Sequence, residues 1–157
     1  MKLNAALTGT ATALLVSAYA GQAIADNKPL TGKYNCTGTA TQSVIIGNVA
    51  GGSQSAKMKA KMSASRGTFL IGSTTPGWPA MIGGYLEPNM QKVALSSQNE
   101  TYKTMLVAGC SVTSMRQKAT GSQNKNGKKA SFTIEQTYSC NYSDSWRVDR
   151  YDLTCKR

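Results

Sequence analysis

Lysine occurs at every second position in one stretch of this chain, at Lys57, Lys59 and Lys61. Residues two apart in an extended strand project from the same face, so these ammonium groups would form a ladder near Arg66. Such a row of cations attracts phosphate, sulfate and carboxylate groups. The chain has 18 Lys and Arg against 7 Asp and Glu. We expect an anionic ligand, although a solvated, aggregation-resistant edge would explain the same lysines.

Two more basic clusters lie later in the sequence. One surrounds the polar segment 121–129, and the other closes the chain. Their members are Lys118, Lys125, Lys128 and Lys129, and Arg147, Arg150, Lys156 and Arg157. Nucleic-acid binding usually adds exposed aromatic side chains that stack on bases. The alternation described below predicts that Phe132, Tyr138 and Trp146 point inward, so we do not expect a nucleic-acid partner.

Residues suited to catalysis are sparse. The sequence has no histidine, the common general base of serine and cysteine hydrolases. Ser122 and Lys125 have the spacing of a serine–lysine dyad, but they lie in an expected hairpin tip, where a lysine keeps its proton. No spacing singles out a carboxylate pair for glycoside hydrolysis among the acids Glu87, Glu100, Glu135, Asp144, Asp149 and Asp152. We expect a protein without enzymatic activity and without a cofactor.

The chain has four cysteines, Cys36, Cys110, Cys140 and Cys155. Without histidine or a Cys-x-x-Cys pair, the usual zinc spacings are absent, so no metal site is expected. In an oxidising compartment an even number of cysteines predicts two disulfides.

The pairing of these cysteines follows from one turn. The Asn126-Gly127 dipeptide suits a type I′ hairpin, which would bring the strands near Cys110 and Cys140 together. We therefore prefer a Cys110–Cys140 bridge, and Cys36 with Cys155 follows by elimination. Four cysteines allow three pairings, and sequence alone does not choose among them.

Alternating apolar and polar residues predict the elements that would position these groups. From Ala130 to Tyr142 the apolar residues share one parity, which is typical of a half-buried antiparallel strand, with Gln136 as the misfit. Lys57 to Met62 alternates in the same way. Further strands are expected over 32–40, 43–49, 68–72, 81–86, 91–96, 102–115 and 146–155. The fold class is all-β: a small up-and-down antiparallel barrel, or a sandwich, of about nine strands.

Turn signals separate these strands. Glycine or proline pairs occur at Gly51-Gly52, Gly77 to Pro79, Gly83-Gly84 and Pro88-Asn89. A change of parity in the last strand predicts a bulge near residues 149–150. The loop 72–86 is apolar, and its Trp78 and Tyr85 are candidate ligand contacts unless the loop packs over a barrel end.

Residues 1–25 are predicted to be a secretory signal peptide. Lys2 precedes a run of small and apolar residues, and Ala23 to Ala25 supplies the small residues before the cut, with a cut after Ala20 as the alternative. Residues 26–157 would then form one β-barrel domain in the periplasm or outside the cell, with no segment apolar enough to span a membrane.

Two resemblances agree with a barrel. Leu-Thr-Gly-Lys-Tyr, ending at Tyr34, resembles the first strand of calycins such as lipocalins and avidins, with tyrosine in place of tryptophan. That likeness implies that a basic residue of the last strand, Arg147 or Arg150, packs across the aromatic ring. Tyr34-Asn35-Cys36 with Cys155 is similar to the layout of periplasmic inhibitors of c-type lysozyme, although those lysozymes are basic and this chain would repel them. Neither resemblance assigns the chain to a family.

The sequence therefore predicts an exported, non-enzymatic binding protein whose mouth or basic face engages an amphipathic or anionic envelope ligand, a lipid or an acidic glycan. The candidate contacts are Lys57, Lys59, Lys61, Arg66, Trp78 and Tyr85. The alternative is a protein-interaction module, such as a periplasmic inhibitor or a structural envelope protein that binds an envelope protein.

Overall fold

The structure is a computed structural model that describes residues 26–157 except 79, 97–104, 108 and 141–144. The predicted signal peptide lies outside the described residues, as do the candidate acids Glu100 and Asp144. Within the described residues all regular secondary structure is β-strand, which confirms the all-β class. No helix in this part of the chain is long and apolar enough to cross a membrane.

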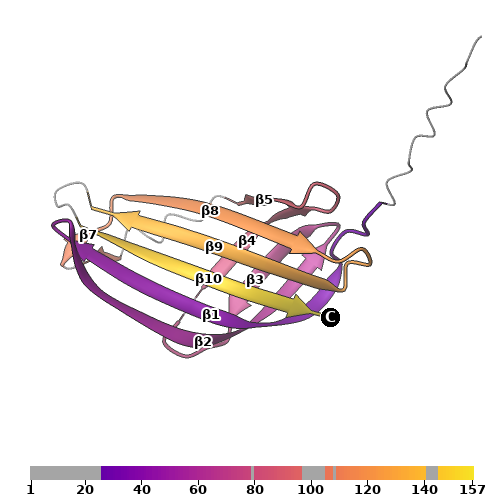
Figure 1. The fold of residues 1–157 in the computed structure, drawn as a ribbon, viewed down its shortest axis with the longest axis horizontal. Helices are drawn as coiled ribbons and strands as arrows, with labels where there is room; N and C mark the ends of the chain where they lie inside the picture. Colours follow the sequence, from indigo (N-terminus) through magenta and orange to yellow (C-terminus); the bar gives the residue numbers. More distant parts are fainter. Residues whose placement is uncertain (1–25, 79, 97–104, 108, 141–144) are drawn as a thin grey trace, which may run out of the picture.

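Eight strands form one antiparallel sheet in the order β5-β4-β3-β2-β1-β10-β9-β8, and β6 with β7 forms a small separate hairpin. Their bounds are β1 Gly32–Ile46, β2 Val49–Ser65, β3 Thr68–Ser73, β4 Met81–Glu87, β5 Lys92–Leu95, β6 Leu106–Val107, β7 Cys110–Ser111, β8 Ser114–Gln123, β9 Lys129–Ser139 and β10 Trp146–Lys156. In Figure 1 the long strands β1, β2 and β8–β10 form the near wall, and β3 and β4 lie behind them.

The sheet curls into a nearly closed barrel rather than a sandwich. Its two outermost strands, β5 and β8, lie next to each other. Side chains join them: Gln117 Nε2 donates to the carbonyl oxygen of Ser96 at 2.7 Å, and the backbone N–H of Gln123 donates to Gln91 Oε1 at 2.5 Å. Strand β10 pairs over its whole length with residues 35–45 of β1, so the remaining gap lies at β5 and β8.

Buried side chains fill the inside of the barrel. Phe69 on β3 and Phe132 on β9 meet across the interior, with ring centroids 4.8 Å apart. The predicted alternation in β9 is confirmed, because every second residue from Ala130 onward is buried. Gln136 is also inside, 3 % exposed, where its Oε1 accepts a hydrogen bond from the Tyr138 hydroxyl at 3.0 Å.

Several turns differ from the predictions. The β1–β2 hairpin turns at Gly47 and Asn48, whose φ angles of 56° and 65° are those a type I′ turn requires. The predicted turns at Gly51-Gly52 and Gly83-Gly84 are wrong, because these pairs lie inside β2 and β4. Gly51 and Gly52 instead accompany a register shift between β1 and β2, which is the behaviour of a β-bulge.

The hairpin between β8 and β9 is confirmed, but its turn type is not. Gly127 has a φ of 66°, whereas Asn126 is not among the residues with positive φ, so the turn is not type I′. The loop is longer than two residues, and the side chain of Asn124 organises it. Its Oδ1 accepts the backbone N–H groups of Lys128 and Lys129, each at 2.9 Å.

Strand β10 contains no bulge, contrary to the prediction. Its register with both β1 and β9 is regular from Trp146 to Lys156. The inward parity therefore runs through Arg147, Asp149, Tyr151 and the following alternate residues, and Trp146 lies on the outer face, half-buried. The sequence misleads because a charged pair occupies two inward positions. Arg147 and Asp149 neutralise each other there, with contacts of 2.7 and 2.6 Å.

The cysteine pairs come together as predicted. Cys36 on β1 and Cys155 on β10 form a disulfide between directly opposed residues. Cys140 lies beside β7, with its Sγ 3.3 Å from the carbonyl oxygen of Cys110. A second bridge between Cys110 and Cys140 stays a prediction.

Candidate anion-binding face

Strand register brings together lysines from all three basic clusters of the sequence. Asn35 on β1 lies opposite Lys61 of β2 on one side and opposite Lys156 of β10 on the other. Lys156 in turn lies opposite Lys129 of β9. The result is a transverse row across four neighbouring strands, which we call the basic row: Lys129, Lys156, Asn35 and Lys61.

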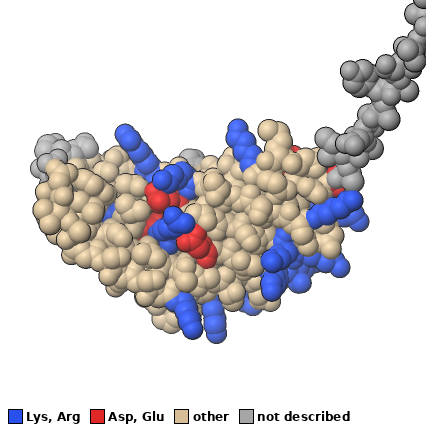
Figure 2. All heavy atoms as spheres, in the orientation of Figure 1, with Lys and Arg blue, Asp and Glu red and all other residues tan. Residues whose placement is uncertain are grey.

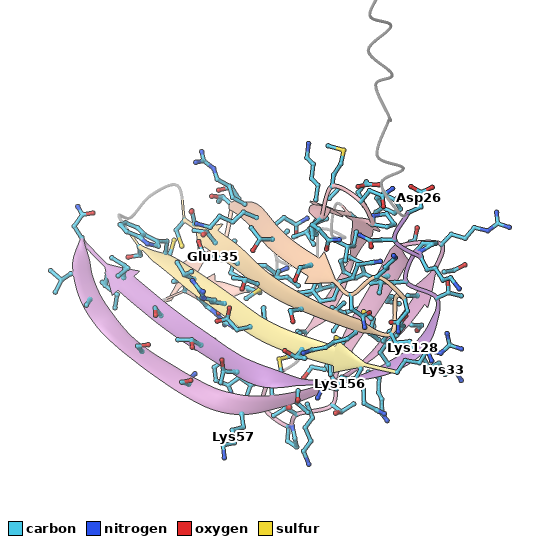
Figure 3. All side chains as sticks on the ribbon, turned by 45° about the vertical axis from the view of Figure 1, so that its right-hand side comes forward. Asp26, Lys33, Lys57, Lys128, Glu135 and Lys156 are labelled. Carbon is cyan, nitrogen blue, oxygen red and sulfur yellow. A yellow bond between two sulfur atoms is a disulfide. The ribbon has the colours of Figure 1, made fainter. Side chains whose placement is uncertain are left out.

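The row widens along β1 and β2 into a larger surface. Lys57 and Lys59 precede Lys61 on the same outer face of β2, and Lys33 precedes Asn35 on β1; all are exposed. Neighbours on one strand face are separated by about 6.7 Å and adjacent strands by about 4.8 Å. We call this surface the basic face: Lys33, Lys57, Lys59, Lys61, Lys129 and Lys156. Figure 2 shows cations gathered at the end where β10 terminates, and Figure 3 shows Lys33, Lys128 and Lys156 at that end.

Carboxylates do not neutralise the basic face within the described residues. The ion pairs found there join Lys118 to Glu135 at 2.8 Å, Arg147 to Asp149 at 2.6 Å and Arg150 to Asp152 at 2.9 Å. The polar contact from the basic row itself is neutral: Lys61 Nζ donates to Asn35 Oδ1 at 2.6 Å. Two ammonium groups about 7 Å apart repel by about 0.6 kcal/mol in water, so a bound anion would relieve a real cost.

Most of the described acids lie elsewhere on the sheet. On the outer face of β8, β9 and β10, Lys118, Glu135, Arg150 and Asp152 form a charge ladder, visible as the mixed red and blue group in Figure 2. Hydrogen bonds from Arg150 and then from Thr133 lower the pKa of Asp152 below its usual value. The carboxylates of this ladder are paired with the cations of the ladder itself, so they do not neutralise the basic face.

The ladder also bears on the carboxylate-pair hypothesis. Glu135 lies opposite Arg150, two residues from Asp152 on the same face, so the two carboxylates are diagonal neighbours at about 7 Å. That separation is within the range that glycosidases use. However, a general acid needs a raised pKa, whereas the pKa of Asp152 is lowered. Both carboxylates are bound to cations, so the geometry is that of an ion-pair ladder.

No known protein family, curated protein or solved structure matches this chain.

The other predicted site residues lie at different places. Arg66 is exposed in the tight turn between β2 and β3, with a φ of 49°. Trp78 is half-buried and packs against the main core, so it covers the barrel interior rather than joining the basic face. Tyr85 is 41 % exposed on the outer face of β4. Thus Lys57, Lys59 and Lys61 lie together, while Arg66, Trp78 and Tyr85 are separate from them.

Neither Arg147 nor Arg150 lies beside Tyr34, because they pair with Val44 and Thr41 further along β1. The Tyr34 hydroxyl donates to the carbonyl oxygen of Gly127 at 2.6 Å, and Arg157 Nη1 donates to the carbonyl oxygen of Thr31 at 3.1 Å. Arg147 instead lies over the ring of Tyr138, 5.8 Å from its centroid. The expectation for Arg147 or Arg150 at Tyr34 is therefore wrong: β10 is antiparallel to β1, so its first residues lie toward the far end of β1, and Arg157, which follows β10, lies at the Tyr34 end.

Sequence reasoning missed Lys33 as a site residue and did not join Lys129 and Lys156 to the β2 lysines. The signal that could have found them is the disulfide. If Cys36 faces Cys155 in antiparallel strands, then Asn35 must face Lys156. Lys129 then joins the row because β9 and β10 are consecutive antiparallel strands, with Lys129 opposite Lys156.

Proposed function

We propose that this chain is an exported, non-enzymatic binding protein that holds an anionic envelope ligand on its basic face. The observation that carries the proposal is the basic row, Lys129, Lys156 and Lys61, without a carboxylate partner among the described residues. A ligand with repeated phosphate or carboxylate groups fits this surface, because spacings of about 5 to 10 Å separate its cations.

The outer face is favoured over the barrel mouth. Core side chains such as Tyr34, Met58 and Ile134 are at most 1 % exposed and fill the interior. The Trp78 loop adds to this packing at the barrel wall. A nucleic-acid ligand is not favoured, since the half-buried Trp146 lies at the opposite end of β10 from Lys156.

The test compares lysine variants with the same change in net charge. Lys59→Gln, Lys61→Gln and Lys156→Gln together remove cations from the basic face. The matched control removes three exposed cations from β5 and β8: Lys92→Gln, Arg116→Gln and Lys118→Gln. Binding is measured by calorimetry to heparin, and by sedimentation with phosphatidylglycerol vesicles, over a series of NaCl concentrations.

We expect the first variant to lose about 100-fold in affinity for at least one probe, at roughly 1 kcal/mol per lysine near an anionic surface. The control should lose much less. Affinity should also fall as NaCl rises, because the screening length shrinks to about 3 Å at 1 M. Equal losses in the two variants would show that net charge alone acts, and would refute the basic face as a site.

A second candidate function rests on an exposed strand edge. Residues 49–58 of β2 pair with β1, but among the described strands nothing pairs with their other edge, since β3 begins its pairing at Ala60. An extended segment of a partner protein can add to such an edge. A bound partner should then protect the 49–58 amides from hydrogen exchange, and unchanged exchange in the complex would exclude this mode.

A further inference from the structure

The outer faces of β3 and β4 carry apolar side chains where an exposed sheet face is usually polar. Leu70 is 47 % exposed, Met81 is 69 % exposed and Tyr85 is 41 % exposed. All have the outward parity, since Phe69, Ile71, Ile82 and Leu86 between them are buried. We call these three residues the apolar ridge.

The register of β3 and β4 places small residues opposite the ridge residues. Met81 faces Gly72, Leu70 faces Gly83, and Tyr85 faces Thr68. The residue directly opposite each large side chain in this pairing is therefore small. Among the described residues, a Cβ on Gly72, opposite Met81, would meet nothing within 4 Å.

The basic face borders the ridge on one side. Lys61 lies opposite Gly72, which lies opposite Met81, so the ammonium group and the methionine belong to one transverse row. Lys33 similarly faces Ser63, which faces Leu70. Each lysine is therefore about two strand spacings, roughly 10 Å, from its ridge residue. Figure 3 shows Lys57 projecting outward from β2, beyond the part of that strand that pairs with β3.

We propose that the apolar ridge and the adjoining lysines dock this protein on the surface of an anionic lipid bilayer. The inference rests on the proposed function and names its ligand. Lysines contact lipid phosphates at headgroup level, while Leu70, Met81 and Tyr85 enter the boundary with the acyl chains. A tyrosine is suited to this boundary because its ring is apolar and its hydroxyl stays in water.

Two other occupants fit less well. An acidic glycan would be bound by the lysines alone and would leave the ridge exposed to water. A second copy of this chain would cover the ridge, but the lysines of the two basic faces would then approach and repel each other. A bilayer with anionic headgroups satisfies both the charge and the apolar surface.

The test replaces the ridge and uses equally exposed apolar residues as control. The ridge variant carries Leu70→Ser, Met81→Ser and Tyr85→Ser. The control carries Val49→Ser, Met90→Ser and Leu106→Ser, at positions that are 68 %, 71 % and 65 % exposed. Sedimentation is measured with vesicles of phosphatidylcholine alone and of an equal mixture with phosphatidylglycerol, in low and high NaCl. Circular dichroism checks that both variants keep the wild-type fold.

We expect wild type and control to bind the mixed vesicles, with a part of the binding resistant to salt because apolar contact is not screened. The ridge variant should lose about 10-fold or more in low salt and all salt-resistant binding. Heparin affinity should be the same in all three proteins, because heparin would bind only through the lysines.

Each other outcome decides against the inference in a different way. If the ridge variant binds vesicles like wild type, or the control loses as much, the ridge has no specific role, and heparin binding shows whether the proposed function survives. If wild type binds heparin but not the mixed vesicles, the ligand is an acidic polymer and the bilayer is excluded. If wild type binds neither probe, both proposals fail.

Discussion

The disulfide between Cys36 and Cys155 should contribute strongly to stability, because it joins residues 119 positions apart in the chain. In the chain-entropy treatment, closing a loop of this length in the unfolded state is worth about 5 kcal/mol at 25 °C. That is a large share of the roughly 5–15 kcal/mol typical of a folded domain. We therefore expect the stability of the fold to depend strongly on this bridge.

The perturbation must remove this bridge alone. We would use a host protein with Cys110→Ser and Cys140→Ser, so that reduction opens only the β1–β10 bridge. Urea unfolding of the oxidised and reduced host, followed by far-ultraviolet circular dichroism, then gives the contribution of the cross-link. A variant with Cys36→Ala and Cys155→Ala gives the additional cost of the cavities, because both sulfurs are buried.

We expect reduction to lower the free energy of unfolding by about 3–5 kcal/mol and the melting temperature by about 10–20 °C. A difference below about 1 kcal/mol would refute the loop argument. Two free thiols per molecule in the oxidised, folded host would refute the pairing itself. Equal stability of the reduced host and the alanine variant would show that the cavities left by the two sulfurs cost nothing, because β1 and β10 relax around them.

Three further results are expected. Non-reducing peptide mapping should recover Cys110 linked to Cys140, a bridge over 30 positions worth about 3.5 kcal/mol in urea unfolding, and free thiols there would contradict it. Asp149→Asn should cost about 3 kcal/mol in the same assay, because it leaves the partly buried Arg147 guanidinium without its carboxylate; a loss under about 1 kcal/mol would contradict this. Burial, and next the charge of Asp149, raise the pKa of Tyr138 to about 12, so ultraviolet titration should show its phenolate forming near that pH. Since the unfolded state ionises first, stability should fall as pH rises from 10 to about 12, and a Tyr138→Phe variant should lose that part of the decline.

Local patterns predicted some of the strands, but the expected strand 43–49 runs across the turn at Gly47 and Asn48, and most of β8 lies beyond the expected strand 102–115. Alternation revealed β9 and the lysine-bearing part of β2, because one face of each is buried and period two follows directly from strand geometry. The same rule failed for β10, where Arg147 and Asp149 occupy inward positions as a paired unit. A pattern that considers one residue at a time does not show that two charges neutralise each other.

Glycine pairs were the poorest predictors of turns. Gly84 lies inside β4, where a Cβ would come within 2.6 Å of the carbonyl oxygen of Ala94 and 2.8 Å of the Phe69 ring. The glycine is there because β5 and the core aromatic approach closely, which is a tertiary reason that looks like a turn signal in sequence. The candidate site could be predicted only in part for a similar reason: Lys61 was visible as part of a ladder, but Lys156 and Lys129 join it through strand pairing.

The seam between β1 and β10 links the stability of the barrel to the placement of the basic row. At the bridge the Cα atoms of Cys36 and Cys155 are 3.9 Å apart, closer than the roughly 4.5–5.5 Å usual between antiparallel strands. Gly38 makes this approach possible, since a Cβ there would lie 1.8 Å from the carbonyl oxygen of Asp152. A slip of one residue would turn every side chain of the slipped strand to the opposite face and would carry Lys156 into the core. The bridge and the glycine therefore fix the register that the interior needs, and the same register holds Lys156 beside Asn35 and Lys61 on the outside.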